Sequence, residues 1–487
     1  MKKQDKEIPV TAVSIPAGKS VFVNRTLNMN HIKLVGFDMD YTLATYNVPA
    51  FEELAYKLMQ EKLIVERGYP EGIRALKFNP EFIIRGLVVD TELGNLMKVN
   101  CYGYLKKTSH GTRFLGIEEH KRIYTAPSID LTDPRFYIIH TLFSLAEGCL
   151  FAQIVDFIDA EKLQMNLKTV FNDIRVCLDD VHQEGVLKGT IIREPEKYLM
   201  RNEAIADTLK RFKHCGKKLA LITNSDYDYS QRVMEYCFGE YFTGPWQDVF
   251  DLIIVASNKP SFFQHGNKFL KVDRKTALLA NFHEPIRYGQ IYQGGNARVM
   301  ERDLGLSPSE ILYLGDHIYG DVVTLKEAIG WRTGLIVQEL EEEVPSLERH
   351  LEQLKALSHR MHEKEELEDR QFALKEMVFA APERREELEK AREELRRKIE
   401  KLDGVLSELI RESQKDFNPY WGEIMRAGNE ESRFATLVEK YACIYLSSVG
   451  NLSYYSPFKY FRPRRRFLAH DPQPYEANNA TGEESSL

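Results

Sequence analysis

Two aspartates stand one residue apart at the end of an apolar run, in the stretch LVGFDMDYTLAT (34–45). Residues i and i+2 of a strand point the same way, so Asp38 and Asp40 face one site if the strand continues through them. Two unit charges about 4 Å apart repel by roughly 4 kcal/mol at an effective dielectric constant of about 20. We therefore expect a cation or a shared proton between the two carboxylates. The alternative is that the pair caps the turn that follows, where Asp is common.

A second pair of carboxylates, Asp316 and Asp321, lies in the stretch ILYLGDHIYGD (311–321). An apolar run ends at Asp316, and a turn beyond Gly320 can fold both carboxylates toward one pocket. The two pairs together offer the oxygen-lined site that suits Mg²⁺, which binds through one or two carboxylates and keeps waters and substrate phosphate oxygens. Calcium fits less well, because the chain lacks the spacing of an EF-hand loop.

Hydroxyl groups and a cation follow two further apolar runs. Thr223, Asn224 and Ser225 come directly after KLALI, and Lys259 comes after DLIIVASN. Next to Asp38, the lysine would neutralise the charge of a transferring phosphoryl group. The alternatives are that the hydroxyl residues belong to turns and that the lysine is exposed. The coincidence of four polar strand ends is much less probable by chance than any one of them.

The runs 32–37, 218–222, 251–257 and 311–315 are apolar without alternation. Continuous apolar runs of this length predict strands that are buried on both faces, as in a parallel sheet covered by helices. In such sheets ligands bind outside the carboxyl ends of the strands. The polar residues named above fall at these ends, so we expect one shared site.

About 185 residues separate the first carboxylate pair from the TNS run, which is too many for a loop. We therefore expect a second structural unit packed over the active edge of the sheet. Within it, FNDIRVCLDDVHQEG (171–185) has helical spacing, and Arg175, Asp179 and His182 would share one face of that helix. A buried ion pair between Arg175 and Asp179 is the competing structural interpretation.

The segment 342–415 has a different pattern, with apolar residues in stripes at helical and heptad spacing. The pattern predicts two antiparallel helices that turn near Ala381 and Pro382. Such a hairpin could bind a partner or an oligomer neighbour, or it could pack on its own domain. The stripes consist of Leu347, Leu351, Leu354 and Met361, and then of Leu388, Leu395, Ile399, Leu402, Leu406 and Leu409.

The stretch KYFRPRRRFLAH (459–470) contains four arginines among aromatic residues, at 462 and 464–466. It could bind phosphate or an acidic partner. We favour a solvated face or an intersubunit salt bridge, because short basic runs usually have that role. The tail 471–487 is expected to be disordered.

Composition sets limits on the protein class. With 487 residues, a formal charge of −7 and 43% apolar residues, the chain should form two or more globular domains. It shows no apolar signal-peptide region at its start and no run of about 18 apolar residues, so we expect a cytoplasmic protein without a membrane segment. Six cysteines without a CxxC pair indicate reduced thiols. The mild acidity argues against nucleic-acid binding.

The order of motifs DMDYT, TNS, a lysine and GDHIYGD resembles the haloacid dehalogenase-like phosphatase superfamily. Longer motifs resemble the cytosolic purine 5′-nucleotidase family, of the cytosolic 5′-nucleotidase II type, over roughly residues 20–460. These motifs are FVNRTLNM (22–29), GFDMDYTLATY (36–46), RGLVVDTELGNLMKV (85–99), RFYIIHTLF (135–143), TNSDYDYS (223–230), YQGG (292–295) and LYLGDHIYGDVV (312–323).

The resemblance implies a role for each strand-end residue. Asp38 would be the nucleophile that forms an aspartyl-phosphate, and Asp40 would protonate the leaving oxygen and then activate water. Mg²⁺ would be bound by Asp38, the backbone carbonyl of Asp40, and Asp316, with Asp321 in support. The phosphoryl oxygens would be bound by Thr223, Asn224, Ser225 and Lys259.

The resemblance also implies a base and ribose site. Phe143 matches an aromatic residue that stacks on the purine, and an arginine at position 175 can donate to a 6-oxo group. Ser144 stands where the family usually has asparagine, so a direct amide contact to the base would be lost or shortened. The remaining matches are Arg175, Asp179, His182 and Lys188.

Members of the family dephosphorylate IMP and GMP, can transfer the phosphate to another nucleoside, and are typically regulated homotetramers. We therefore expect a purine nucleoside monophosphate as substrate, a nucleotide effector, and a tetramer or dimer. The positions of the family's effector site carry Asp130, His140 and Glu327. Acidic side chains there would repel a polyphosphate, so the effector site should differ in form.

The expected fold is α/β, with a Rossmann-like haloacid dehalogenase-type core, an inserted α+β cap and a helical C-terminal extension. Two alternatives to a purine nucleotidase stay open: a related phosphatase for another phosphometabolite, and an interaction protein that uses the helical hairpin. The expected layout is 1–60 for the start of the core, 61–200 mainly for the cap, 201–341 for the rest of the core, 342–415 for the hairpin, 416–470 for C-terminal helices on the core or a partner subunit, and 471–487 for the tail.

Overall fold

The computed structural model describes residues 14–126, 128–265 and 267–465. Its main sheet has ten strands, and the four apolar runs predicted as strands lie next to one another in it. All four are parallel, so their carboxyl ends meet at one edge of the sheet. Their spatial order is β16 (Ile311–Gly315), β3 (Leu34–Phe37), β11 (Lys218–Ile222) and β12 (Leu252–Val255).

The sheet continues on both sides of these four strands. The parallel strands β17 (Arg332–Ile336) and β20 (Ile444–Leu446) extend one side, and β15 (Gln290–Gly294) extends the other. Antiparallel strands complete the two edges. They are β1 (Phe22–Val23), β13 (Phe269–Val272) and β14 (Leu279–Asn281).

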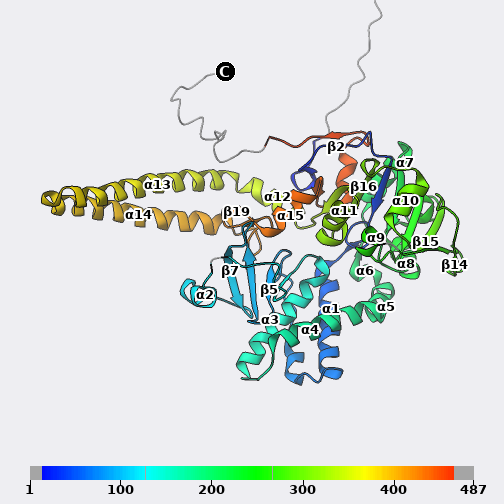
Figure 1. Ribbon diagram of the computed structural model, residues 1–487, viewed down its shortest axis with the longest axis horizontal. Coiled ribbons are helices and arrows are strands. Elements are labelled where there is room, and N and C mark those ends of the chain that lie inside the picture. The colour runs from blue at the N-terminus through cyan, green and yellow to red at the C-terminus, as the bar shows by residue number, and fades with distance from the viewer. Residues whose placement is uncertain (1–13, 127, 266, 466–487) are drawn as a thin grey trace, which may run out of the picture.

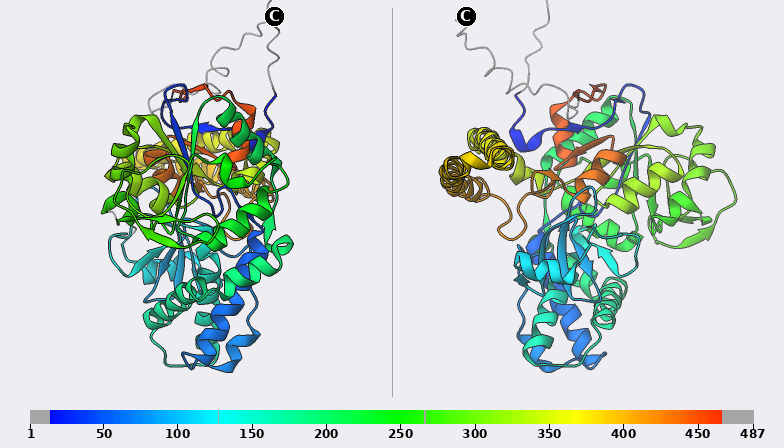
Figure 2. Two further views of the ribbon diagram at one scale, coloured as in Figure 1. Left: turned by 90° about the vertical axis from the view of Figure 1, so that its right-hand side faces the viewer. Right: turned by 60° about the vertical axis from the view of Figure 1, so that its left-hand side comes forward.

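Helices cover both faces of the main sheet (Figure 2). Successive residues of β3 show this directly, because Leu34 packs into one hydrophobic core and Val35 and Phe37 pack into another. This packing confirms the α/β fold expected from the apolar runs. The helices are α7 (Glu203–His214), α8 (Tyr227–Phe238), α9 (Ser261–Gln264), α10 (Ala297–Leu304), α11 (Thr324–Ala328) and α15 (Arg433–Tyr441).

A cap is inserted between two short strands, β4 (Thr45–Tyr46) and β10 (Leu199–Met200), which pair with each other in antiparallel fashion. It contains an antiparallel sheet in the order β8-β7-β6-β5-β9 and a layer of helices, and lies below the main sheet in Figure 1. The strands are β5 (Val88–Asp90), β6 (Asn95–Val99), β7 (Leu105–His110), β8 (Arg113–Phe114) and β9 (Phe136–Ile138). The helices are α1 (Val48–Val65), α2 (Ile117–Ile123), α3 (Leu145–Ala160), α4 (Leu167–Gln183), α5 (Val186–Arg193) and α6 (Pro195–Tyr198).

The first cap helix crosses the boundary that we expected between residues 60 and 61. Helix α1 packs against α3 and α4 of the cap, and Asn47 caps its first turn through a hydrogen bond to Ala50 N. We therefore place the cap between the paired strands β4 and β10. The chain crosses between core and cap at these two adjacent strands.

Two long helices, α13 (Leu351–Ala380) and α14 (Arg385–Ser413), form an antiparallel hairpin after α12 (Leu340–Arg349). The hairpin projects as an arm from the rest of the chain (Figure 1). An ion pair of 2.6 Å between Lys364 and Asp403 joins the two helices. Leu388, Ile399, Leu402 and Leu406 are buried, whereas Phe372 and Phe379 near the tip are exposed.

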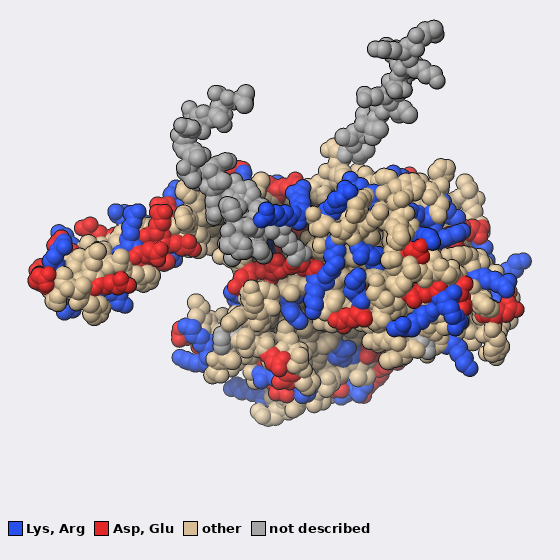
Figure 3. Space-filling model, turned by 45° about the horizontal axis from the view of Figure 1, so that its top comes forward, with Lys and Arg blue, Asp and Glu red and all other residues tan. Residues whose placement is uncertain are grey.

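Basic and acidic side chains are interspersed over the face shown in Figure 3, including the arm. Within the described ranges, none of the helices has the length and apolar character needed to cross a bilayer. The tail predicted to be disordered, 471–487, lies outside the described residues, as does Arg466 of the arginine run. In the described part of that run, the Arg462 guanidinium lies 3.9 Å from the centre of the Tyr460 ring.

Candidate active site

Asp38 follows the central strand β3 directly. Its Oδ2 lies 2.8 Å from Lys259 Nζ, and its Oδ1 accepts a hydrogen bond of 2.7 Å from Met39 N. Burial raises the pKa of Asp38 to about 7, although the lysine opposes this shift. The side chain remains 13% exposed, so the carboxylate can meet a ligand.

Asp40 is held by two hydroxyl groups. Tyr46 donates to its Oδ1 at 2.6 Å, and Ser225 donates to its Oδ2 at 2.8 Å. Burial raises the pKa of Asp40 above its ordinary value, while these two hydrogen bonds act in the opposite direction. A raised pKa favours the protonated carboxyl, which is the form that a general acid needs.

Strand β3 does not continue through Asp38 and Asp40, so the condition under which the two aspartates would share one strand face is not met. Strand β3 ends at Phe37, and the chain then turns because Leu43 N and Ala44 N both donate to Met39 O, at 2.9 and 2.8 Å. Tyr41 adopts a φ of +54° within this turn. Within this turn each carboxylate has its own hydrogen-bond partners.

Lys259 lies between two carboxylates. Its Nζ is 2.8 Å from Asp38 Oδ2 and 2.9 Å from Asp321 Oδ1, and it donates to the Tyr313 hydroxyl at 2.7 Å. Burial disfavours the charged ammonium, but Asp321 and Asp38 outweigh this effect and raise the pKa of Lys259. The lysine is therefore a buried cation, contrary to the alternative of an exposed side chain.

The side chain of Asn224 holds the loop that carries this lysine. Its Oδ1 accepts from Lys259 N at 2.6 Å, and its Nδ2 donates to Lys259 O at 2.9 Å. The Thr223 hydroxyl accepts from Ser225 N at 3.1 Å. These hydrogen bonds connect the segments that follow the neighbouring strands β11 and β12. Both polar atoms of the Asn224 side chain are used in this connection.

Three carboxylates come together beside Lys259. One oxygen from each of Asp38, Asp316 and Asp321 lies within 4.8 Å of the others. Asp316 Oδ2 is buried without a hydrogen-bond partner among the described residues, and burial, with Asp321 and Asp38, raises its pKa well above the ordinary value. A buried oxygen without a partner and a set of hard oxygen donors fit Mg²⁺. Gly315 makes room, because a Cβ there would lie 2.3 Å from Asp321 Oδ2.

The residues expected to contact a base gather on the cap side. The Phe143 ring packs edge-on against Tyr41 and His182, with ring centres 4.6 and 5.5 Å apart. Arg175 projects from α4, and its guanidinium lies 4.4 Å from the centre of the Tyr137 ring. The structure therefore brings Phe143, Arg175 and His182 to one region of the cap.

Glu147 is the partner of Arg175 that the sequence interpretation missed. Its Oε1 lies 3.7 Å from Arg175 Nη1, and neither carboxylate oxygen makes a hydrogen bond of normal geometry to a described residue. Burial raises the pKa of Glu147 to about 7, with Arg175 opposing. Asp179 is exposed and forms no ion pair with Arg175 among the contacts of the described residues, which removes the competing interpretation. A lone glutamate in the apolar stretch LAEGCLFA was the available signal.

The other two predicted ligand residues lie at the edges of this region. Lys188 forms an ion pair of 2.8 Å with Asp226 and lies 5.1 Å from the centre of the Tyr229 ring. Ser144 is buried, and its hydroxyl lies 3.5 Å from that of Tyr137. Tyr229 in turn contacts the Tyr46 hydroxyl that holds Asp40, so Lys188 is close to the carboxylate site.

The three positions of the family's effector site have separate environments. Asp130 is exposed on a loop and accepts a hydrogen bond from the Thr132 hydroxyl. Glu327 accepts from the Tyr441 hydroxyl at 2.6 Å. His140 is half-buried against Tyr319, with ring centres 4.1 Å apart, and its Nδ1 has no partner among the described residues.

His140 provides a prediction for pH dependence. Burial, with His317 and Arg433, lowers the pKa of His140 to about 3 from an ordinary value of 6.5. Between these values the unfolded chain binds more protons, so the free energy of unfolding falls as the pH falls, by up to about 1.4 kcal/mol per pH unit for one proton. We expect His140→Phe, which keeps a ring against Tyr319, to remove this contribution.

Urea unfolding of both proteins at about pH 7.5 and about pH 5.5 measures this difference. The variant should lose less stability than the wild type between the two values, by roughly 1 kcal/mol. An identical loss in both proteins would show that His140 does not titrate in this way.

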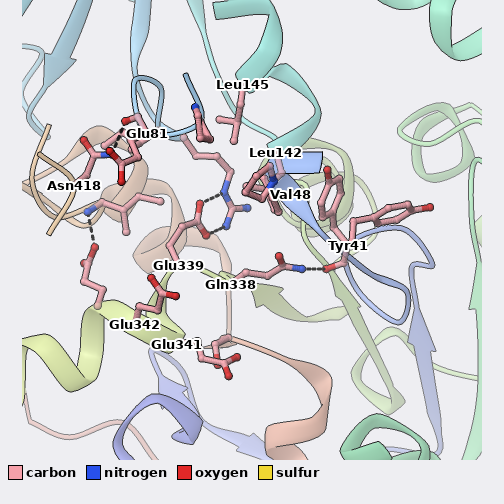
Figure 4. Close-up of a pocket in the computed structure, with 18 of the residues that line it drawn as sticks. Tyr41, Val48, Glu81, Leu142, Leu145, Gln338, Glu339, Glu341, Glu342 and Asn418 are labelled. Atoms are coloured by element: carbon pink, nitrogen blue, oxygen red, sulfur yellow. Dashed lines mark hydrogen bonds and ion pairs between the residues drawn. The ribbon is translucent and has the colours of Figure 1, made fainter. Parts of the chain in front are cut away.

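A groove of about 780 Å³ is lined in part by the turn that follows Asp40 (Figure 4). Tyr41 and Thr42 form part of its wall, together with Gln338 and Arg85. Its rim is acidic, whereas the three clustered carboxylates of the candidate metal site are not among its lining residues. The acidic residues are Glu81, Glu339, Glu341, Glu342, Glu343 and Asp416.

A parallel sheet with a nucleophile-type aspartate after its central strand, a lysine from a neighbouring strand, clustered aspartates and an inserted cap defines a haloacid dehalogenase-like phosphatase. The model of the 5′ nucleotidase family matches residues 21–473. The chain belongs to this 5′-nucleotidase family, and it is a phosphoric monoester hydrolase.

Two relatives match almost the whole chain. A 5′-nucleotidase domain-containing protein of Dictyostelium discoideum is 30% identical over 97% of this chain and 78% of its own length. The 5′-nucleotidase domain-containing protein 2 of Homo sapiens is 29% identical over 98% of this chain and 89% of its own. A solved structure, described as a predicted phosphoglycolate phosphatase from Haemophilus somnus, is 15% identical, covers 63% of this chain and 87% of its own, and has a TM-score of 0.28.

Proposed function

We propose that this chain hydrolyses 6-oxopurine nucleoside 5′-monophosphates, of the IMP and GMP type, in a Mg²⁺-dependent reaction. The observation that carries this proposal is the pairing of Arg175 with Glu147, 3.7 Å apart, with Arg175 on the same helix α4 as His182, whose ring contacts Phe143. A 6-oxopurine presents a carbonyl acceptor next to an N1–H donor, whereas adenine presents the reverse pattern. A guanidinium beside a carboxylate matches the first pattern.

Asp38, Asp316 and Asp321 would hold Mg²⁺, with the backbone carbonyl of Asp40 as a further ligand. When bound, the ion neutralises charge on the phosphoryl oxygens and orients the group. Lys259 Nζ, which already lies between two carboxylates, adds a fixed positive charge at the same place. The Thr223 hydroxyl is the remaining phosphoryl contact from the strand ends, because the single proton of the Ser225 hydroxyl is donated to Asp40.

In the first step, a carboxylate oxygen of Asp38 forms a bond to phosphorus while the bond from phosphorus to the nucleoside O5′ breaks. Asp40 gives its proton to O5′, and the nucleoside leaves as a neutral alcohol. The raised pKa of Asp40 supports its role as the acid in this step. Asp38 carries the phosphoryl group at the end of the step.

In the second step, a water molecule attacks the phosphorus and Asp40 takes its proton. The bond between phosphorus and Asp38 breaks, which returns the carboxylate and releases phosphate. A nucleoside 5′-hydroxyl in place of this water would give phosphotransfer by the same proton movement. The balance between the two outcomes depends on which acceptor enters the site.

The test of this function is the substitution Arg175→Met, which keeps length and removes the donors. Hydrogen bonds to charged groups contribute about 1.5–3 kcal/mol, so the KM for IMP and GMP should rise by roughly 10- to 100-fold. The KM for p-nitrophenyl phosphate, which has no base, should stay unchanged. Initial rates of phosphate release from both kinds of substrate measure the difference.

Lys168→Met on the same helix α4 is the matched control, because Lys168 pairs with Glu92 away from the base region. It should leave every KM unchanged. An equal effect of Arg175→Met on IMP and on p-nitrophenyl phosphate would show that Arg175 is structural. A wild-type preference for phosphosugars over all nucleotides in the same panel would favour the related phosphatase for another phosphometabolite.

We also propose a cytoplasmic location, a homotetramer or dimer, and a nucleotide effector. All six cysteines are free thiols in the described part of the chain, which suits a reducing compartment. The expectation of an oligomer and of an effector rests on the resemblance to the cytosolic purine 5′-nucleotidases. Rates with and without ATP and GTP would test the effector.

A further inference from the structure

Arg85 is a fully buried arginine that links the cap to the core. It lies in the segment just before β5, and its side chain is 0% exposed. Its Nε and Nη2 donate to the two carboxylate oxygens of Glu339 at 2.8 and 2.5 Å. Its Nη1 donates to the backbone carbonyl of Asp316 at 3.0 Å. The central carbon of the guanidinium lies 5.3 Å from the centre of the Phe434 ring.

The contact with Asp316 fixes one peptide group. The carbonyl of Asp316 and the N–H of His317 belong to the same planar unit, so they move together. Arg85 holds the carbonyl, and the N–H donates to Asp321 Oδ2 at 3.2 Å. One peptide plane therefore connects the buried guanidinium to two of the three clustered carboxylates.

The other end of this connection lies at the groove. Glu339 directly precedes α12, and its side chain remains 27% exposed toward the groove that it lines. Its neighbour Gln338 donates from Nε2 to the carbonyl of Tyr41 at 3.2 Å, in the turn that follows Asp40 (Figure 4). Gln338 thus contacts the turn that follows Asp40 directly, whereas Glu339 is connected to the loop of Asp316 through Arg85.

We propose that Arg85, oriented by Glu339, is a positioning residue for the metal site. It holds the peptide plane between Asp316 and His317, and so keeps the carboxylates of Asp316 and Asp321 in the arrangement that a Mg²⁺ ion requires. This inference rests on the proposed Mg²⁺ dependence. It adds two residues that touch neither substrate nor metal and that lie 231 and 23 positions away from Asp316 in the sequence.

A purely structural role makes a different prediction. If Arg85 only tied the cap to the core, its loss would lower stability and leave the metal affinity of the folded protein unchanged. If it positions the carboxylates, Mg²⁺ binding weakens in folded protein, because residues that orient metal ligands typically change metal affinity by about 10- to 100-fold. The two roles therefore separate in a measurement of binding.

Isothermal titration of the full chain with Mg²⁺, without substrate, is the direct test. Arg85→Lys keeps the charge but cannot reach Glu339 and the Asp316 carbonyl together, so the Kd for Mg²⁺ should rise about tenfold or more. Glu339→Gln leaves only one acceptor for the guanidinium and should give a smaller rise of the same kind. The Mg²⁺ concentration for half-maximal hydrolysis of p-nitrophenyl phosphate should shift in parallel, with kcat at saturating Mg²⁺ within about threefold of wild type.

Lys98→Met is the matched control. Lys98 is another buried cation, and its Nζ donates to the backbone carbonyls of Trp421 and Glu423, neither of which belongs to the cluster of Asp38, Asp316 and Asp321. Its loss should lower the melting temperature and leave the Kd for Mg²⁺ unchanged. If Arg85→Lys does not fold, Glu339→Gln carries the test.

Wild-type Kd values in folded Arg85→Lys and Glu339→Gln would overturn the inference and leave the proposed function intact. A wild-type protein that binds no Mg²⁺ and is active without it would instead overturn the metal dependence, and this inference with it.

Discussion

Asp38→Asn should lower kcat for GMP by roughly 10⁴-fold or more, because loss of a nucleophile removes the covalent route altogether. An amide carries no charge and does not attack phosphorus, and the hydrogen bonds from Tyr46 and Ser225 keep Asp40 in its own position, so it does not take the place of the nucleophile. Phosphate release from GMP measures the effect. Far-UV circular dichroism and the melting temperature show whether the fold is intact.

Asp251→Asn is the matched control for this substitution. Asp251 pairs with Lys218 at 3.0 Å at the amino end of β12, on the opposite edge of the sheet from the site. We expect it to retain wild-type turnover. More than about a tenth of the wild-type kcat in folded Asp38→Asn would exclude Asp38 as the nucleophile.

Asp40→Asn should have an effect that depends on the leaving group. General acid–base catalysis contributes about 10²- to 10⁴-fold, and an alkoxide such as the nucleoside O5′ needs the proton, whereas p-nitrophenolate leaves without it. With p-nitrophenyl phosphate, the first step should stay fast and the second step, which needs a base for water, should become slow. Stopped-flow absorbance should then show a burst of one p-nitrophenolate per active site before slow turnover.

With GMP, the same variant should show no burst of guanosine, because its first step is slow as well. Asp228→Asn, an exposed residue on α8, is the matched control and should behave as wild type with both substrates. An equal loss of rate on both substrates, without a burst, would mean that Asp40 maintains the conformation of the turn and does not transfer the proton.

The parts of the site that could be predicted are those attached to strands with a strong local pattern. Asp38, Thr223, Lys259 and Asp316 each follow an apolar run, and parallel strands place such residues at one edge of the sheet. The helix that carries Arg175 was likewise visible in its periodicity. The bend after β3 was not visible, because no local pattern distinguishes a strand that ends at Phe37 from one that continues to Asp40.

The parts that could not be predicted depend on contacts between distant segments. Arg85 reaches Asp316, and Glu147 meets Arg175 across two helices of the cap. Neither contact gives a periodic pattern in the sequence, because Arg85 and Glu147 are each a single charged residue in a mostly apolar stretch. The predicted start of the cap differs from the observed start for a similar reason. The two-residue strands β4 and β10 are too short to show alternation in the sequence.

The arm formed by α13 and α14 bears on how the size of this protein is measured. A helix of 30 residues is about 45 Å long, and the arm stands clear of the globular part of the chain (Figure 1). A size-exclusion column separates molecules by Stokes radius, and an extended projection raises this radius far more than it raises mass. A single copy would therefore elute at the position of a heavier globular protein. Light scattering or sedimentation, which report mass itself, are needed to distinguish a monomer from the expected dimer or tetramer.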